Sequence, residues 1–207
     1  MKNLFLCSYF AGVKDLFRQY ASEKQLGKHV LFIPTAGNVE EYRGYIDEAL
    51  QAFAELGFQV EILDISACDR ETAQAKIFQS KLLYVSGGNT FYLLQELKKK
   101  ELLFLIKEQI ADDMVYVGES AGAVITAENI DYIRLMDDKE VAGELSDTVA
   151  LHEADFYLLP HVGEEPFVES AQATLDTYSD QLNLLPLNNR QAVLVEGEEV
   201  KVLEEDK

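Results

Sequence analysis

The pentapeptide Gly118-Glu119-Ser120-Ala121-Gly122 constrains the fold of this chain more than any other stretch. A short apolar run, residues 114–117, leads into it, and a helix-compatible stretch, residues 121–128, follows it. A G-x-S-x-G turn between a strand and a helix raises a serine hydroxyl above the carboxyl edge of a sheet, and the small residues permit the sharp turn. The sequence therefore predicts that Ser120 is a nucleophile. The alternative is a tight strand–helix turn in which serine acts only as a cap.

Apolar segments alternate with helix-compatible ones through the first part of the chain. Strands are expected at residues 3–7, 29–34, 58–65, 82–85 and 114–117, with helices at 14–26, 40–56, 69–79, 90–100 and 102–111. This alternation predicts an α/β fold, a three-layer sandwich with a mainly parallel sheet covered on both faces. Ligands of such sheets bind beyond the carboxyl ends of the strands.

The second part of the chain is less regular. We expect loop with short strands at 130–141, a strand at 154–159, a helix at 166–182 and a hairpin over 191–203. At 207 residues, the chain is expected to form a single domain, residues 1–207.

A serine nucleophile needs a base, and the chain has three histidines. His29 begins an inner strand and is expected to be structural or on the surface. His152 lies in a polar-flanked stretch and is expected at the surface. His161 directly follows a strand that Pro160 ends, and the carboxyl end of a strand is also where Ser120 is expected. The sequence therefore favours His161 as the general base.

The base then needs an acid that fixes its tautomer and stabilises the imidazolium. Glu196 follows the apolar run 193–195, so a strand would hold it rigidly. Asp137 and Asp138, in a loop between the serine and the histidine, are the competitors, and the residues alone leave this choice open. Backbone N–H groups of Ala121 and of Gly88, in the turn Gly87-Gly88-Asn89-Thr90, are the expected oxyanion donors. The other interpretation of that turn is a helix cap formed by Asn89 or Thr90.

The formal net charge of −19 disfavours nucleic acid and anionic membranes as partners. Cys7 and Cys68 lie in separate segments without metal or redox spacing, which favours a reducing compartment, and we expect a cytoplasmic protein without a cofactor or metal. No apolar run is long enough to span a bilayer, which takes about 18 residues or more. The expected partner is a small peptide substrate, and a homodimer is an open alternative to a monomer.

The motif Ser-Gly-Gly-Asn-Thr-Phe-Tyr-Leu-Leu at 86–94, followed by Gly-Glu-Ser-Ala-Gly-Ala at 118–123, resembles the peptidase E (dipeptidase E) and cyanophycinase family of serine peptidases. The resemblance runs over most of the chain and is closest over 82–125. It implies a sheet like that of the class I glutamine amidotransferases, with serine in place of cysteine. It also implies a Ser–His–acid peptidase that acts on short peptides through an acyl-enzyme.

Each expected site residue matches a motif of that family. Ser120 matches the nucleophile, His161 its Pro-His at a strand end, and Glu196 its Glu-Gly acid. Asp137 lies near a loop aspartate sometimes assigned to that role instead. Gly88 and Ala121 match the oxyanion donors.

One departure concerns specificity. Aspartyl-specific members carry Gly-His-x-Gly-Glu-Thr-Arg after the catalytic histidine, whereas residues 161–167 here read His-Val-Gly-Glu-Glu-Pro-Phe, without the arginine. We therefore expect a serine exopeptidase or dipeptidase that is not strictly aspartyl-specific. The same segment could align His161 with its own histidine and leave His152 as the base. The alternative functions are a catalytically silent binding or regulatory module and an esterase-type hydrolase. An esterase of the α/β-hydrolase type should carry its histidine near the C-terminus, and no histidine follows His161.

Overall fold

A seven-stranded sheet forms the centre of the molecule, and the computed structural model describes residues 2–205 of the chain. The strands lie in the order β3-β2-β4-β5-β1-β8-β9. They are β1 (Asn3–Cys7), β2 (His29–Ile33), β3 (Gln59–Ile62), β4 (Leu82–Val85), β5 (Val115–Glu119), β8 (Gln191–Glu196) and β9 (Glu199–Glu204). The first five pair in parallel, whereas β8 runs antiparallel to β1 and β9 antiparallel to β8. The predicted α/β fold with a mainly parallel sheet is confirmed.

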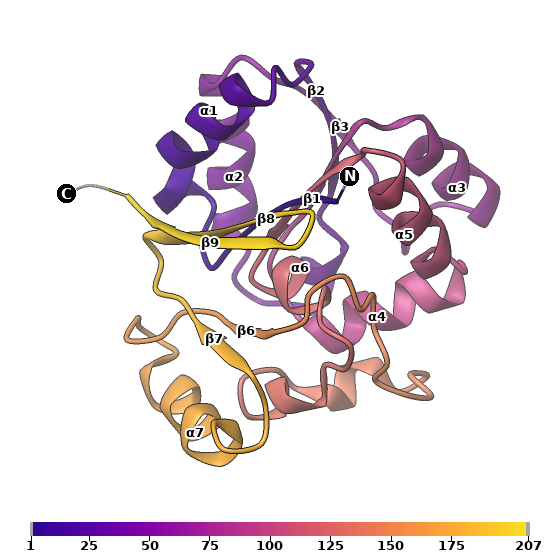
Figure 1. Ribbon diagram of the computed structural model, residues 1–207. Helices are drawn as coiled ribbons and strands as arrows, with labels where there is room; N and C mark the ends of the chain where they lie inside the picture. Colours follow the sequence, from indigo (N-terminus) through magenta and orange to yellow (C-terminus); the bar gives the residue numbers. More distant parts are fainter. Residues whose placement is uncertain (1, 206–207) are drawn as a thin grey trace.

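Helices cover both faces of this sheet (Figure 1). They are α1 (Lys14–Glu23), α2 (Gly44–Glu55), α3 (Arg70–Gln79), α4 (Thr90–Lys99), α5 (Leu103–Ala111), α6 (Ala121–Val124) and α7 (Val168–Tyr178). Short 3₁₀ helices are η1 (Ala11–Val13), η2 (Thr35–Val39), η3 (Asp131–Leu135) and η4 (Lys139–Ala142). None of the helices within residues 2–205 has the length and apolar content needed to cross a bilayer.

Alternate residues of the strands enter two separate cores because successive side chains point to opposite faces. On one face, Phe5 and Cys7 pack with α1 and α2 in a core rich in aromatic rings, where Phe10 stacks on Phe53 with ring centroids 4.5 Å apart. On the other face, Leu4 and Leu6 pack with side chains of α3, α4, α5 and α6. Both cores are buried, which explains the near-continuous apolar runs of the inner strands.

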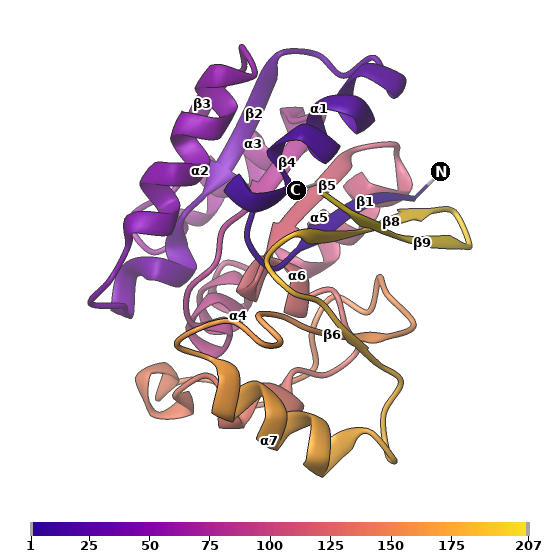
Figure 2. The same cartoon turned by 90° about the vertical axis from the view of Figure 1, so that its left-hand side faces the viewer.

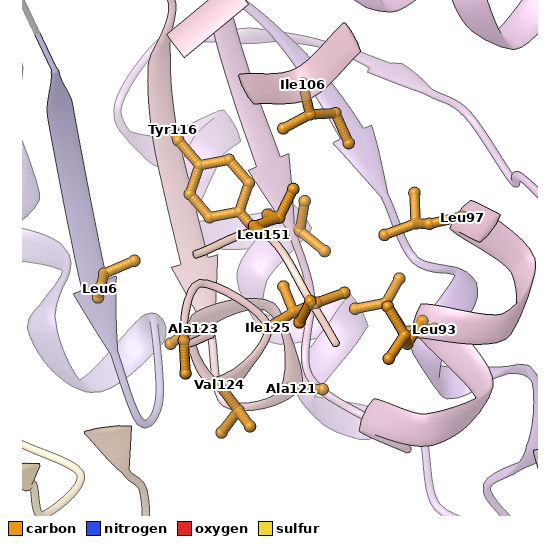
Figure 3. Close-up of a cluster of buried hydrophobic side chains, with 14 of the residues drawn as sticks. Leu6, Leu93, Leu97, Ile106, Tyr116, Ala121, Ala123, Val124, Ile125 and Leu151 are labelled. Atoms are coloured by element: carbon orange, nitrogen blue, oxygen red, sulfur yellow. The ribbon is translucent and has the colours of Figure 1, made fainter. Parts of the chain in front are cut away.

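The short helix α6 is fixed in the second core (Figure 3). Ala123, Val124 and Ile125 lie among side chains of β1, β5 and α4. The Tyr116 hydroxyl on β5 donates a 2.6 Å hydrogen bond to the carbonyl of Gly122. The helix that follows Ser120 is therefore held against its own strand.

The second part of the chain forms a layer beyond the carboxyl edge of the parallel strands. Here β6 (Tyr157–Leu159) and β7 (Leu184–Pro186) pair in parallel as a separate two-stranded sheet connected through α7. Figures 1 and 2 both show β6 and α7 beyond the edge at which α6 lies. The stretch 130–141 contains the 3₁₀ helices η3 and η4 rather than the short strands that were expected, and β7 was not expected.

Candidate active site

Ser120 occupies a strained corner between β5 and α6, with φ of 46° and ψ of −108°. The flanking glycines make the corner possible. A Cβ atom on Gly118 would lie 2.4 Å from the carbonyl oxygen of Gly122, and one on Gly122 would lie 2.1 Å from that of Val85. The strand–turn–helix geometry expected of the motif is therefore present, and it exposes the serine at the carboxyl edge of the sheet.

His161 lies against Ser120, with its Nε2 3.0 Å from the serine Oγ. It follows β6 and adopts a left-handed backbone, with φ of 61°. Its N–H donates to Ser8 Oγ at 3.2 Å, and the Ser8 hydroxyl donates to the carbonyl of Leu187 at 3.1 Å. The structure thus brings together the serine and the histidine that the sequence singled out.

Asn189 holds the other side of the imidazole ring. The Nδ1 of His161 lies 2.7 Å from Asn189 Oδ1. An amide oxygen only accepts, so Nδ1 carries the proton and Nε2 is left with a lone pair facing the Ser120 hydroxyl. This tautomer is the one that a general base needs.

The imidazole is enclosed as well as hydrogen-bonded. The ring of Phe167 stacks on it, with centroids 4.6 Å apart and planes inclined by 19°. Burial lowers the pKa of His161 below its ordinary value, while the hydrogen bond to Asn189 and the charge of Glu164 act in the opposite direction. His161 is therefore neutral near pH 7, as a base must be before it accepts a proton.

Glu196 is far from this group, so the prediction that it orients His161 is corrected. Because β8 runs antiparallel to β1, Glu196 pairs in register with Asn3 at the amino edge of the parallel strands. There it forms an ion pair with Lys24. The start of β8, not its end, shares an edge with Ser120, and Asn189 lies two residues before that start.

Asp137, the alternative acid, does not contact His161 either. Its carboxylate Oδ2 accepts a 2.8 Å hydrogen bond from the backbone N–H of Thr90, the first residue of α4. Burial raises the pKa of Asp137 to about 6. Asp138 is exposed, and its carbonyl accepts a 2.8 Å hydrogen bond from the Asn89 side chain.

Of the expected oxyanion donors, Gly88 lines the cavity, and Ala121 directly follows Ser120. Gly88 has φ of 126°, and a Cβ there would lie 2.3 Å from the carbonyl carbon of Ala36, so only glycine fits. Ala121 is the first residue of α6, and within residues 2–205 neither its N–H nor that of Gly88 has an acceptor. The capping interpretation of the same turn also holds, since Asn89 Oδ1 accepts from the N–H of Tyr92 at 2.9 Å.

Glu119 is a buried carboxylate that the sequence did not mark out. It accepts hydrogen bonds from Phe10 N–H at 2.7 Å, the Tyr84 hydroxyl at 2.5 Å and Gly87 N–H at 3.4 Å. It thereby connects the ends of β1, β4 and β5 directly beside Ser120. Burial raises its pKa to about 7. A charged residue at the end of an otherwise apolar strand is the signal that could have indicated such a role, because a buried carboxylate requires donors around it.

The remaining histidines lie elsewhere. His29 begins β2 at the amino edge, and His152 is exposed. Ser120 and His161 instead line a cavity of about 820 Å³ that also reaches Gly88, Asn189 and Asp137. In the part of the chain that the structure describes, no group of three or more His, Cys, Asp or Glu side chains is arranged to hold a metal ion.

Comparison with known proteins identifies the family to which this chain belongs. The model of peptidase family S51 matches residues 6–203, and the chain therefore belongs to that family. This confirms the resemblance to peptidase E that the motifs indicated.

Individual relatives agree with this assignment. The chain is 47% identical over 198 residues to Uncharacterized peptidase PM1590 of Pasteurella multocida, covering 96% of this chain and 95% of that one. A protein named Peptidase E from Shewanella sp. is 38% identical over 102 residues, which is 48% of this chain and 41% of the relative. A crystal structure of a candidate peptidase E from Listeria monocytogenes EGD-e superposes with a TM-score of 0.94 and 42% identity over the whole of both chains.

Proposed function

We propose that this protein is a serine peptidase that hydrolyses short peptides through an acyl-enzyme, with Ser120 as the nucleophile and His161 as the general base. The observation that carries the proposal is the 3.0 Å separation between Ser120 Oγ and His161 Nε2. Membership of peptidase family S51 supports the same reaction class.

In the proposed reaction, Ser120 Oγ attacks the carbonyl carbon of the substrate while Nε2 of His161 takes the hydroxyl proton. The oxyanion that forms accepts hydrogen bonds from the N–H groups of Gly88 and Ala121. The imidazolium then gives its proton to the leaving amine, and the C–N bond breaks. Water, deprotonated by His161, attacks the acyl-enzyme and releases the acid product and the free Ser120 hydroxyl.

In this proposal Asn189 is the third member of the triad, the group that orients His161. A neutral amide fixes the tautomer and orientation of the imidazole but adds no negative charge beside the imidazolium. Cysteine peptidases of the Cys-His-Asn type use the same arrangement. Glu164, whose Oε1 accepts from Asn189 N–H at 3.4 Å, supplies a more distant negative charge.

We also propose that the enzyme is an exopeptidase or dipeptidase without strict aspartyl specificity. A buried substrate carboxylate needs a cationic partner, preferably arginine. Among the described residues, no lysine or arginine side chain lines the cavity. Free Cys7 and Cys68 support a reducing compartment such as the cytoplasm.

Fluorophosphonate labelling tests the proposal. A fluorophosphonate probe should modify Ser120, and Ser120→Ala should abolish labelling and peptide turnover while the protein remains folded. His161→Ala should lower kcat by several orders of magnitude, and His152→Ala should be nearly neutral. Turnover by folded Ser120→Ala at the wild-type rate would refute the proposal, and so would folded wild-type protein that never reacts with the probe.

A further inference from the structure

The cavity around Ser120 is bordered by acidic side chains from three different segments. Apart from Glu119, they are Glu40, Glu41, Glu48, Asp137, Asp138 and Glu165. The first three lie at and before α2, the next two between η3 and η4, and the last just before Pro166. The negative charge therefore surrounds the opening instead of lying on one exposed helix face.

These carboxylates lack the cations that accompany acids elsewhere on the molecule. Within residues 2–205, the ion pairs involve carboxylates outside the cavity, such as Glu55, Asp147 and Glu196. Arg43 lies close to Gly37 and Tyr45 but is not part of the cavity wall. Among the described residues, no ion pair neutralises the carboxylates of the cavity, so we infer a negative potential there.

Asp137 and Glu40 are the two cavity acids for which the missing cationic partner has the largest effect. Burial raises the pKa of both, and the charge of Glu40 adds to the rise at Asp137. Glu40 is exposed and Asp137 is half-buried, both line the same cavity, and their two charges repel each other. A cation placed between them would remove that repulsion and gain from both charges.

Aromatic rings complete the lining. Tyr42 and Tyr45 have ring centroids 6.3 Å apart, and Tyr42 is 69% exposed at the opening. Phe167 contributes a third ring beside His161. Carboxylates together with aromatic faces are the groups that bind ammonium and guanidinium ions.

We propose that this cavity selects peptides that carry a positive charge, with Asp137 and Glu40 as the specificity-determining carboxylates. The inference rests on the proposed function, because it concerns the same site. The shared chemistry of the ligand is an ammonium or guanidinium group. Its source can be the free α-amino group of a peptide or the side chain of lysine or arginine.

Binding to Ser120→Ala separates this inference from catalysis. Four tripeptide amides, Ala-Xaa-Ala with lysine or norleucine in the middle and a free or acetylated N-terminus, are titrated calorimetrically. We expect at least one of two replacements, norleucine by lysine or the acetylated N-terminus by a free one, to tighten binding about tenfold. Two partly exposed charge pairs predict a gain of this size. The comparison of lysine with norleucine peptides reports binding of a side-chain cation. The comparison of free with acetylated N-termini reports binding of an α-ammonium group. Equal affinity of all four peptides would overturn the inference.

Variants test the assignment of residues. In the Ser120→Ala background, Glu40→Gln and Asp137→Asn should each reduce the preference for the cationic peptide about threefold or more. Glu198→Gln is the matched control, because it removes the same charge from the exposed β8–β9 turn. Its ratio of affinities for the cationic and the neutral peptide should equal that of Ser120→Ala alone. Equal ratios in all three variants would overturn the assignment, and circular dichroism confirms that each is folded.

The two proposals fail in different ways. If folded wild-type protein never reacts with a fluorophosphonate, the proposed peptidase function is refuted. Wild-type protein that does react, and whose kcat/KM is the same for lysine and norleucine peptides with free or acetylated N-termini, removes only the charge selection.

Discussion

At the scale of single residues, the partner of His161 is the main point on which sequence and structure differ. Asn189 Oδ1 accepts from Nδ1 and presents the basic Nε2 to Ser120. The usual partner of a catalytic histidine is a carboxylate, so the residue type of Asn189 does not point to this role. Glu196 could take it only if the end of β8 reached the edge where Ser120 lies. Neither the direction of β8 nor its place beside β1 is encoded in the local residue pattern.

Asn189→Ala provides the corresponding prediction. Without the acceptor at Nδ1, the imidazole can adopt the wrong tautomer or rotate, so kcat should fall roughly 10²-fold or more. Asn189→Asp keeps an acceptor in place and should retain most of the activity. Glu196→Gln, at the opposite edge, should behave like wild type in the same steady-state assay. A larger loss from Glu196→Gln than from Asn189→Ala would restore the acid as the partner.

The stacked ring of Phe167 gives a prediction about pH. Burial lowers the pKa of His161, so the neutral base persists to lower pH than an exposed histidine would allow. Phe167→Ala should hydrate the imidazole, raise its pKa toward the ordinary value and move the acid limb of the kcat/KM profile to higher pH. Phe78→Ala, at a 64% exposed position on α3, is the control. An unchanged acid limb in Phe167→Ala would contradict this account of the shift.

At the scale of secondary structure, the parallel strands were predictable because each is a short apolar run between amphipathic helices. The strand–turn–helix corner was predictable too, because glycines on both sides of a serine permit a sharp turn that larger residues would block. The layer formed by η3, η4, β6 and β7 was not, because its elements are short and are held by contacts with the rest of the fold. Tyr132, for example, fixes its segment by donating a 2.6 Å hydrogen bond to the carbonyl of Leu158.

The close approach of α6 to β4 can be tested through Gly122. An added methyl group would lie 2.1 Å from the carbonyl oxygen of Val85, so the helix must shift. Gly122→Ala should therefore lower the free energy of unfolding by about 1–3 kcal/mol, the usual effect of overpacking, and should weaken activity through displacement of Ser120. Gly27→Ala is the matched control, because a Cβ there meets no atom within 4 Å. Urea denaturation of both variants makes the comparison, and equal stability would contradict the close approach.

At the scale of the whole molecule, the buried Glu119 couples the active-site edge to global stability. Its carboxylate joins the ends of β1, β4 and β5 through Phe10, Tyr84 and Gly87. Burial raises its pKa from 4.5 to about 7. A protonated Glu119 therefore contributes stability that is fully present below about pH 4.5 and is lost as the pH rises through about 7.

The comparison of wild type with Glu119→Gln isolates this contribution, because His161 and Asp137 titrate in both proteins. Each unit of separation between folded and unfolded pKa is worth about 1.4 kcal/mol. The difference in free energy of unfolding between wild type and Glu119→Gln should therefore be larger at about pH 5 than at about pH 8. Urea titrations at the two pH values measure it, and Glu198→Gln controls for the change in net charge. A difference that stays constant, or that grows toward alkaline pH, would show that Glu119 is ionised in the fold at all these values.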